Sequence, residues 1–299
     1  MKDTDYHVPV LLEESISSIL ENKDSTASKI YVDCTLGGGG YTEEILRRTD
    51  DGVNVIAIDR DINSIEYCKK KLERFKNRIV YCCDNFANIS EILINSQVYK
   101  TNKKISGIVL DLGLSSYQLD KEEGFSYLRD TGLDMRADKT QELQAKDVLN
   151  GYSEIELLKI FKEYGELKYN KQITRDIISY RKEKRFERTS ELVDLLKKKI
   201  PFKYVNKDLS KIFQALRIAV NDELGNLEKV LNDSVLFFEQ GGRIAVISYH
   251  SLEDRIVKNF IRSNKELIAI TKKPVTASKA EIKLNPKARS GKLRTAEKI

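Results

Sequence analysis

Short apolar runs alternate with amphipathic segments along the first 111 residues. The runs cover residues 30–32, 53–58, 79–82 and 105–110, and consist mainly of Ile, Val and Tyr. Between them, apolar residues recur at helical spacings of three and four, as at Ile65, Cys68, Leu72 and Phe75. Strands that alternate with helices in this way predict a parallel sheet with helices on both faces.

The pattern changes near residue 118. From there to residue 208 no convincing strand follows, and amphipathic helix patterns take over, with a capping-box signature at Ser153 and Glu156. A long helix is expected from about residue 209 to residue 238, and a fifth strand at 243–248. We therefore predict an α/β core formed by residues 1–117 and 209–299, interrupted by an all-helical insertion at 118–208.

A glycine run, Gly37–Gly40, lies between the first predicted strand and the helix that follows it. Glycine is needed where a ligand approaches the main chain, and a helix start offers free N–H groups. The arrangement predicts a nucleotide-like ligand at the carboxyl end of the strand, although an ordinary turn can also contain several glycines. Asp59 ends the second strand, where a carboxylate can accept hydrogen bonds from both ribose hydroxyls of an adenosine.

The third glycine of the dinucleotide fingerprint is missing, because Thr42 occupies that position. A nicotinamide cofactor is therefore disfavoured. S-adenosyl-L-methionine fits better, since it has no pyrophosphate to place at the helix N-terminus.

Composition narrows the class of protein. With 40% hydrophobic and 33% charged residues the chain is typical of soluble globular proteins, and no run approaches the ~18 apolar residues of a membrane helix. The N-terminal residues lack the layout of a signal peptide, so a cytoplasmic location is expected. Four cysteines without a CxxC pattern and only two histidines argue against disulfides and a structural metal site.

Positive charge is concentrated in two segments. From Lys272 to the end there are nine Lys/Arg and two Glu, within a total net charge of +6, and a second basic cluster spans residues 181–188. Both segments are candidate contacts for a polyanion such as RNA. A solvated tail and a solvated helix face explain the same charges.

Several longer segments resemble one family. They are HVPVLLEE at 7–14, DLGLSSYQLD at 111–120, GFSY at 124–127, LDMR at 133–136, FQALRIAVNDEL at 213–224, SYHSLEDR at 248–255 and NPKARS at 285–290. Together and in this order they resemble the RsmH (MraW) family, bacterial methyltransferases that act on a cytosine of 16S ribosomal RNA. The resemblance spans nearly the whole chain.

This resemblance implies a Rossmann-like, class I methyltransferase core with a helical insertion that recognises RNA. It implies S-adenosyl-L-methionine as donor and, as acceptor, the exocyclic N4 of a cytidine in the decoding region of the small subunit. The donor contacts carried over by position are Gly39, Gly40, Tyr41, Asp59, Phe86, Asp111 and Gln118. Relatives usually carry His at the position of Tyr41 and often Pro at that of Tyr117, which affects the expected hydrogen bonds.

For catalysis, an acceptor for an N–H of the cytosine amine would sharpen its lone pair. Asp111 is the predicted group, with Ser115 or Ser116 as an accompanying group, and His250 is the second choice, with a structural role as its alternative. Two other classes remain open: a nicotinamide-dependent enzyme, and a non-catalytic RNA-binding or ribosome-assembly protein that retains the fold.

Overall fold

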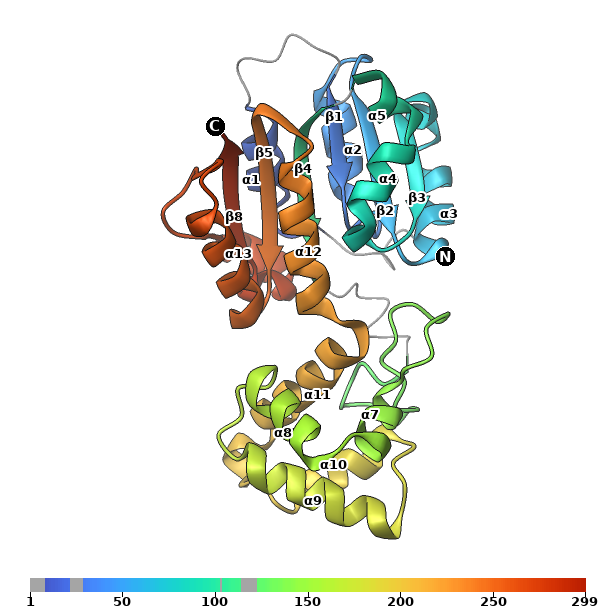
Figure 1. The fold of residues 1–299 in the computed structure, drawn as a ribbon, viewed down its shortest axis with the longest axis vertical. Coiled ribbons are helices and arrows are strands. Elements are labelled where there is room, and N and C mark those ends of the chain that lie inside the picture. The colour runs from blue at the N-terminus through green and yellow to red at the C-terminus, as the bar shows by residue number, and fades with distance from the viewer. Residues whose placement is uncertain (1–8, 22–28, 103, 114–122) are drawn as a thin grey trace. The chain divides into compact units, whose positions relative to one another are not determined.

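The computed structural model describes residues 9–21, 29–102, 104–113 and 123–299. The chain forms two compact units, Met1–Ser115 with Leu224–Ile299, and Ser116–Glu223 (Figure 1). We call them the sheet unit and the helical unit. The interruption of the core extends to Glu223, so the boundary predicted at residue 208 was placed too early.

Five parallel strands form the body of the sheet unit, in the order β3-β2-β1-β4-β5. Their bounds are β1 Ile30–Asp33, β2 Asn54–Asp59, β3 Ile79–Cys83, β4 Ile105–Asp111 and β5 Phe238–Ser248. The first four agree with the predicted runs, and β5 begins earlier than expected. This order reverses direction between β1 and β4, which in open α/β sheets is where ligands bind.

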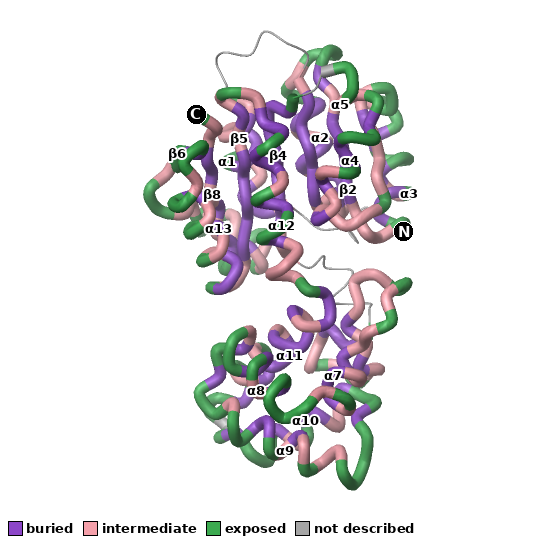
Figure 2. The backbone as a smooth tube through the Cα atoms, in the orientation of Figure 1, coloured by how far each residue is buried: buried purple, intermediate pink, exposed green. Residues whose placement is uncertain are grey.

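The strands of the sheet are buried along most of their length (Figure 2), and alternate residues belong to two separate cores. Ile30, Val32 and Ile56 belong to one core, whereas Tyr31 and Val55 belong to the other. A strand buried on both faces needs apolar residues at every position, which explains why these strands could be recognised as continuous runs.

Helices cover both faces of the sheet (Figure 1). Residues of α4 Ile89–Asn95, α12 Glu223–Val235 and α13 Ser251–Ser263 join the core that contains Ile30. Residues of α1 Leu12–Leu20, α2 Gly40–Arg48 and α3 Ile62–Lys71 join the core that contains Tyr31. Other helical segments among the described residues of the sheet unit are η2 Glu73–Arg78, η3 Phe86–Asn88, α5 Gln97–Asn102, α14 Lys279–Leu284 and η5 Pro286–Ser290.

The basic C-terminal segment is folded, contrary to the solvated tail considered above. Strand β8, Lys292–Lys298, pairs antiparallel with β5, and the short strands β6 Leu267–Ala269 and β7 Val275–Thr276 pair with β8. Arg294 Nε lies 2.7 Å from Asp254 Oδ1, and Lys298 pairs with Glu266. Some of the C-terminal cations therefore form ion pairs within the sheet unit.

The helical unit is built around a core of its own. Its helices are α7 Ala145–Gly151, α8 Glu154–Glu163, α9 Asn170–Glu183, α10 Thr189–Lys197, the short η4 Phe202–Tyr204 and α11 Val205–Asn221. Leu157, Ile177, Leu192 and Leu216 are completely buried in it. Ser153 and Glu156 form the predicted capping box at the start of α8.

The single long helix expected at 209–238 is two helices. Helix α11 ends at Asn221, and Asp222 adopts a left-handed conformation with φ 46° before α12 begins. The Asn221 side chain holds this end in place, because its Nδ2 donates to the carbonyl of Met135 over 2.8 Å. Asn and Asp tolerate the left-handed region better than most residues, so the Asn-Asp pair is a helix-end signal that the periodicity obscures.

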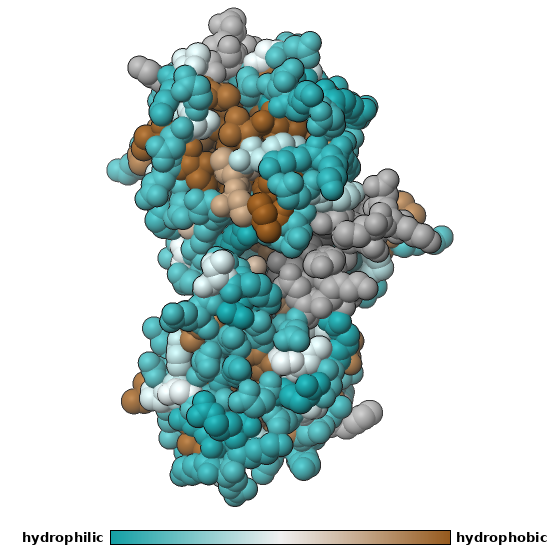
Figure 3. Space-filling model, turned by 90° about the vertical axis from the view of Figure 1, so that its right-hand side faces the viewer, coloured by the Kyte–Doolittle hydropathy of each residue, from teal (hydrophilic) through white to brown (hydrophobic). Residues whose placement is uncertain are grey.

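The face of the helical unit visible in Figure 3 is largely hydrophilic, whereas apolar side chains gather on part of the sheet unit's visible face. Among the helices of the described ranges, none is long and apolar enough to cross a membrane.

Candidate active site

Three aspartates end neighbouring parallel strands. Asp33 ends β1, Asp59 ends β2 and Asp111 ends β4, and these strands are adjacent in the order β2-β1-β4. Because parallel strands end at the same edge of a sheet, the three carboxyl groups lie along its carboxyl edge. The glycine run follows β1 at that edge, as the sequence predicted.

The Asp59 carboxylate is fixed by the glycine loop. Its Oδ2 accepts the Gly37 amide over 2.7 Å, and its Oδ1 accepts the Asp61 amide over 2.9 Å. Burial raises the pKa of Asp59, although these amide hydrogen bonds counteract the shift. Each carboxylate oxygen has two lone pairs, so both can accept a further hydrogen bond, as two ribose hydroxyls would require.

Packing within the protein explains the glycines at positions 39 and 40. Gly39 has φ 75°, and a Cβ there would lie 2.9 Å from the Sγ of Cys68. A Cβ on Gly40 would lie 2.1 Å from Cγ of Pro9. Close approach of α3 and of the N-terminal segment therefore requires both glycines, whether or not a ligand is present. Their donor contacts stay a prediction.

Asp111 is buried and is contacted by two tyrosine hydroxyls. Tyr249 donates to Asp111 Oδ1 over 2.7 Å, and the Tyr41 hydroxyl lies 3.2 Å from Oδ2 and 2.6 Å from the carbonyl oxygen of Val10. Burial, followed by the nearby Asp111 charge, raises the pKa of both phenols well above the usual range. Both hydroxyls therefore stay protonated. Tyr249 donates to the carboxylate, whereas the single proton of the Tyr41 hydroxyl has the closer Val10 carbonyl as its main acceptor and Asp111 as a second, longer one.

Tyr249 is a site residue whose role the sequence analysis did not identify. It directly follows β5, and its ring lies against the backbone of Gly113, where a Cβ would come within 2.7 Å of Tyr249 Cε2. The available signal was its position at the end of a predicted strand, next to His250. Glycine at 113 allows the ring to reach Asp111.

Asp33 is the second residue that was missed. It is completely buried, and it accepts the Thr42 hydroxyl over 2.7 Å and the Thr35 amide over 3.1 Å. Burial, together with the negative charges of Asp59 and Asp111, raises the pKa of Asp33 to about 6 against the opposing hydrogen bonds. Its position at the end of a strand, directly before the glycine loop, was the signal that could have identified it.

This shift predicts a pH-dependent stability. The folded-state pKa of Asp33, about 6, exceeds the reference value of 3.8, so the folded protein binds this proton more tightly than the unfolded chain. The contribution of Asp33 to the free energy of unfolding therefore falls as pH rises from about 4 to 6, by on the order of 3 kcal/mol. Asp33→Asn is expected to be more stable than the unmodified protein above pH 7, with the difference shrinking toward pH 4.

Thermal unfolding of both proteins between pH 4.5 and 8 measures this difference. Asp51→Asn, at an exposed aspartate, is the matched control and should shift little at any pH. A stability difference for Asp33→Asn that stays constant across the range would contradict the assignment.

Phe86 begins η3, directly after the turn that follows β3. It is half-buried, packs against the core that contains Ile30, and lies with its ring 5.5 Å from the guanidinium carbon of Arg60. One part of the ring therefore belongs to the core and the other part is accessible. Stacking on an adenine stays a prediction for this residue.

Other predicted residues have a structural role or fall outside the described ranges. Gln118, Tyr117, Ser115 and Ser116 lie outside the described residues. His250 caps α13, where its Nδ1 accepts the Glu253 amide over 3.4 Å and its Nε2 lies 3.0 Å from Glu253 Oε1. His250 thus has a structural role at the start of this helix, and its catalytic role stays a prediction.

The chemistry of this edge fits S-adenosyl-L-methionine better than a dinucleotide. Asp33, Asp59 and Asp111 are close enough for the charges of the last two to shift the pKa of the first. Such a group of carboxylates attracts the sulfonium and ammonium charges of the methyl donor. It would repel a pyrophosphate.

The chain is similar over nearly its whole length to proteins of one family. The profile described as the MraW methylase family matches residues 4–299. Three relatives, each named ribosomal RNA small subunit methyltransferase H, are similar over nearly their whole length. The protein of Clostridioides difficile strain 630 is 43% identical over 98% of this chain and 99% of the relative; that of Caldicellulosiruptor bescii is 44% identical over the same shares; that of Fusobacterium nucleatum subsp. nucleatum is 42% identical over 99% and 98%.

Proposed function

We propose that this chain, which belongs to the MraW methylase family, transfers the methyl group of S-adenosyl-L-methionine to a cytidine of ribosomal RNA. The acceptor in this proposal is the exocyclic N4 of a cytidine in the decoding region of 16S RNA, within the small subunit or its precursor. The near full-length similarity to relatives named ribosomal RNA small subunit methyltransferase H carries the proposal. A cytoplasmic location, where this RNA is found, belongs to the same proposal.

In this proposal S-adenosyl-L-methionine binds at the carboxyl edge of the sheet. Asp59 accepts the ribose hydroxyls, and Gly39 with the first residues of α2, Gly40 and Tyr41, lies beside the methionine portion. Phe86 packs beside the adenine, and Asp111 lies toward the transfer end. The support is that Asp59 is already oriented by the Gly37 amide and keeps acceptor capacity on both oxygens.

Bound donor supplies an activated methyl group on a positively charged sulfur. The cytosine amine is a poor nucleophile, because its lone pair is delocalised into the ring. Holding the amine in line with the methyl group can contribute up to ~7–11 kcal/mol in favourable cases. Asp111 accepts an N–H of the amine, and the hydroxyls of Tyr41 and Tyr249 keep its carboxylate in one orientation.

Methyl transfer to small ribosomal subunits that lack the modification tests this function. With isotopically labelled donor, digestion of the RNA to nucleosides should recover the label in N4-methylcytidine. Label in another nucleoside would contradict the acceptor assignment. A protein that binds the subunits without any transfer would be the non-catalytic assembly factor instead.

Calorimetric titration distinguishes a methyltransferase from a nicotinamide-dependent enzyme. S-adenosylhomocysteine is expected to bind, whereas NAD is not, because the three carboxylates repel its pyrophosphate. Tight binding of NAD alone would favour a nicotinamide-dependent enzyme.

A further inference from the structure

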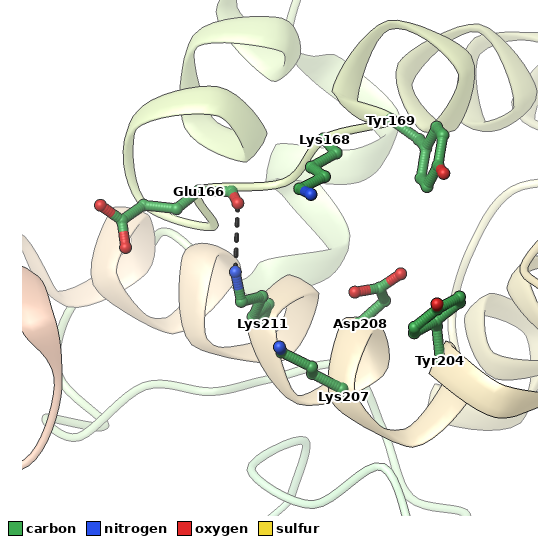
Figure 4. A pocket seen from close by; sticks show the side chains of 7 residues that line it. All are labelled: Glu166, Lys168, Tyr169, Tyr204, Lys207, Asp208 and Lys211. Atoms are coloured by element: carbon green, nitrogen blue, oxygen red, sulfur yellow. Dashed lines mark hydrogen bonds between the residues drawn. The ribbon is translucent and has the colours of Figure 1, made fainter.

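The helical unit contains a pocket that is lined by none of the residues assigned to the active site. Its volume is about 210 Å³, and it lies between the segment that follows α8 and the segment that runs from η4 into α11 (Figure 4). Two tyrosines, three lysines and one aspartate of its lining carry the argument: Tyr169, Tyr204, Lys168, Lys207, Lys211 and Asp208.

The two tyrosines are unusual in their exposure. Tyr169 is 58% exposed and Tyr204 is 46% exposed, whereas Phe161, Phe186 and Phe213 of the same unit are buried. In Figure 4 they extend toward the same end of the pocket from its two sides, and the Asp208 carboxylate lies beside Tyr204. Exposed aromatic rings on either side of a polar opening are the arrangement that RNA-binding proteins use to stack unpaired bases.

The backbone holds both tyrosines firmly. Tyr169 precedes α9, and its carbonyl accepts the Ile173 amide over 3.0 Å. Tyr204 precedes α11, and its amide donates to the carbonyl of Pro201 over 2.8 Å. Their backbone positions are therefore set before any ligand arrives, which reduces the entropy lost on binding.

The segment that carries Tyr169 is also tied to α11. Glu166 adopts a left-handed conformation with φ 46°, and its carbonyl accepts the Lys211 ammonium over 3.1 Å (Figure 4). At the preceding position a Cβ on Gly165 would lie 2.8 Å from the carbonyl oxygen of Phe161. A tight turn fixed by this lysine keeps the two sides of the pocket together.

The charges lining the pocket suit a nucleotide. Lys168 extends its ammonium group into the pocket, and the Lys207 ammonium lies on the α11 side near Lys211 (Figure 4). Both line the pocket and can contact phosphates. Lys203 lies with its Nζ 5.8 Å from the ring of Tyr204, and so adds a further cation beside this tyrosine. The Asp208 carboxylate offers only acceptors, and can therefore bind two adjacent N–H donors of a base edge.

The basic cluster at residues 181–188 is a weaker candidate than its sequence suggested. Arg181 donates to the carbonyls of Leu149 and Tyr152 over 2.9 and 2.6 Å. Arg188 pairs with Asp130, and Lys184 with Glu191. Three of its cations thus hold the helical unit together.

We propose that this pocket binds one unpaired nucleotide of the RNA substrate, distinct from the cytidine that is methylated. The base stacks between Tyr169 and Tyr204, Asp208 accepts hydrogen bonds from its edge, and the lysines contact the adjoining phosphates. Guanine is the preferred base, since its N1–H and N2–H are adjacent donors, whereas uracil offers one donor between two carbonyls. The inference rests on the proposed function for the identity of the RNA.

Binding of two fluorescein-labelled RNA heptamers to the full chain tests the pocket. The heptamer UUUGUUU should bind more tightly than UUUUUUU in fluorescence anisotropy at low salt. Tyr169→Ala and Tyr204→Ala should each weaken binding of UUUGUUU roughly ten-fold, and Tyr204→Phe should stay within about two-fold because stacking survives. Asp208→Asn should remove the preference for guanine.

Controls separate the pocket from general damage and from the proposed function. Ile155→Ala, at a residue of the helical unit that is 80% exposed and does not line the pocket, should leave RNA affinity unchanged. S-adenosylhomocysteine affinity and thermal unfolding should be unaltered in the tyrosine variants, whose KM for small subunits should rise. Absence of methyl transfer by the unmodified protein would refute the proposed function while the heptamer titrations still test the pocket.

Two outcomes overturn the inference. One is unchanged heptamer affinity in both alanine variants. The other is weaker binding to whole subunits with unchanged heptamer affinity, which would mean that the pocket takes a segment of a ribosomal protein.

Discussion

Replacing Asp59 by alanine is expected to weaken binding of S-adenosylhomocysteine on the order of 100-fold or more. Each hydrogen bond to a charged group contributes about 1.5–3 kcal/mol, and two ribose hydroxyls are assigned to this carboxylate. The substitution also leaves the Gly37 and Asp61 amides without their acceptor, so the glycine loop loses its orientation. Isothermal titration calorimetry measures the affinity, with unfolding by circular dichroism as the test of the fold.

Asp61→Ala is the matched control for this prediction. Asp61 caps α3 and accepts the Asn63 amide over 2.8 Å, so its loss should cost about 0.5–2 kcal/mol of stability. It should change donor affinity little, because only its backbone amide contacts Asp59. Unchanged affinity in Asp59→Ala, with a normal fold, would exclude the assigned ribose contact.

Asp111→Asn is expected to lower kcat for methyl transfer roughly 10²–10³-fold, with a much smaller effect on donor affinity. The amide removes the negative charge that accepts an N–H of the cytosine amine. It also places an NH₂ group, which cannot accept a hydrogen bond, opposite one of the two tyrosine hydroxyls that lie against the carboxylate. Single-turnover transfer to small subunits measures the chemical step apart from product release.

Tyr249→Phe tests whether the orientation of Asp111 matters. Loss of the 2.7 Å hydrogen bond should lower kcat about ten-fold and leave KM for the donor nearly unchanged. Tyr81→Phe removes another tyrosine hydroxyl of the sheet unit, one that donates to the carbonyl of Cys68 over 3.1 Å, and should leave kcat unaltered. Equal effects of the two tyrosine substitutions, or full activity of Asp111→Asn, would contradict the role given to Asp111.

The parallel strands could be predicted because burial on both faces leaves a continuous apolar run. Strand β8 was not predicted, because it lacks such a run: Lys292, Arg294 and Lys298 dominate its composition. In the sheet these charges pair with acids, while Leu293 and Thr295 point inward and are buried. The alternation of charged side chains with Leu293 and Thr295 could have indicated a strand, but the many charges favoured an exposed segment.

Parts of the site could not be predicted because they depend on contacts between segments that are distant in the sequence. Asp59 follows an adenosine-binding pattern and could be identified from sequence, whereas the function of Tyr249 depends on pairing β5 beside β4. The pocket of the helical unit combines Tyr169 with Tyr204, which are separated by helices α9 and α10. No local pattern brings such residues together, because their proximity follows from how the helices pack.

A crystal structure of this protein with S-adenosylhomocysteine tests the central claim most directly. We predict the ribose hydroxyls within hydrogen-bonding distance of Asp59 and the sulfur near Asp111, at the carboxyl edge of β1, β2 and β4. Density for the ligand at any other place, or a ribose held by residues other than Asp59, would contradict the account.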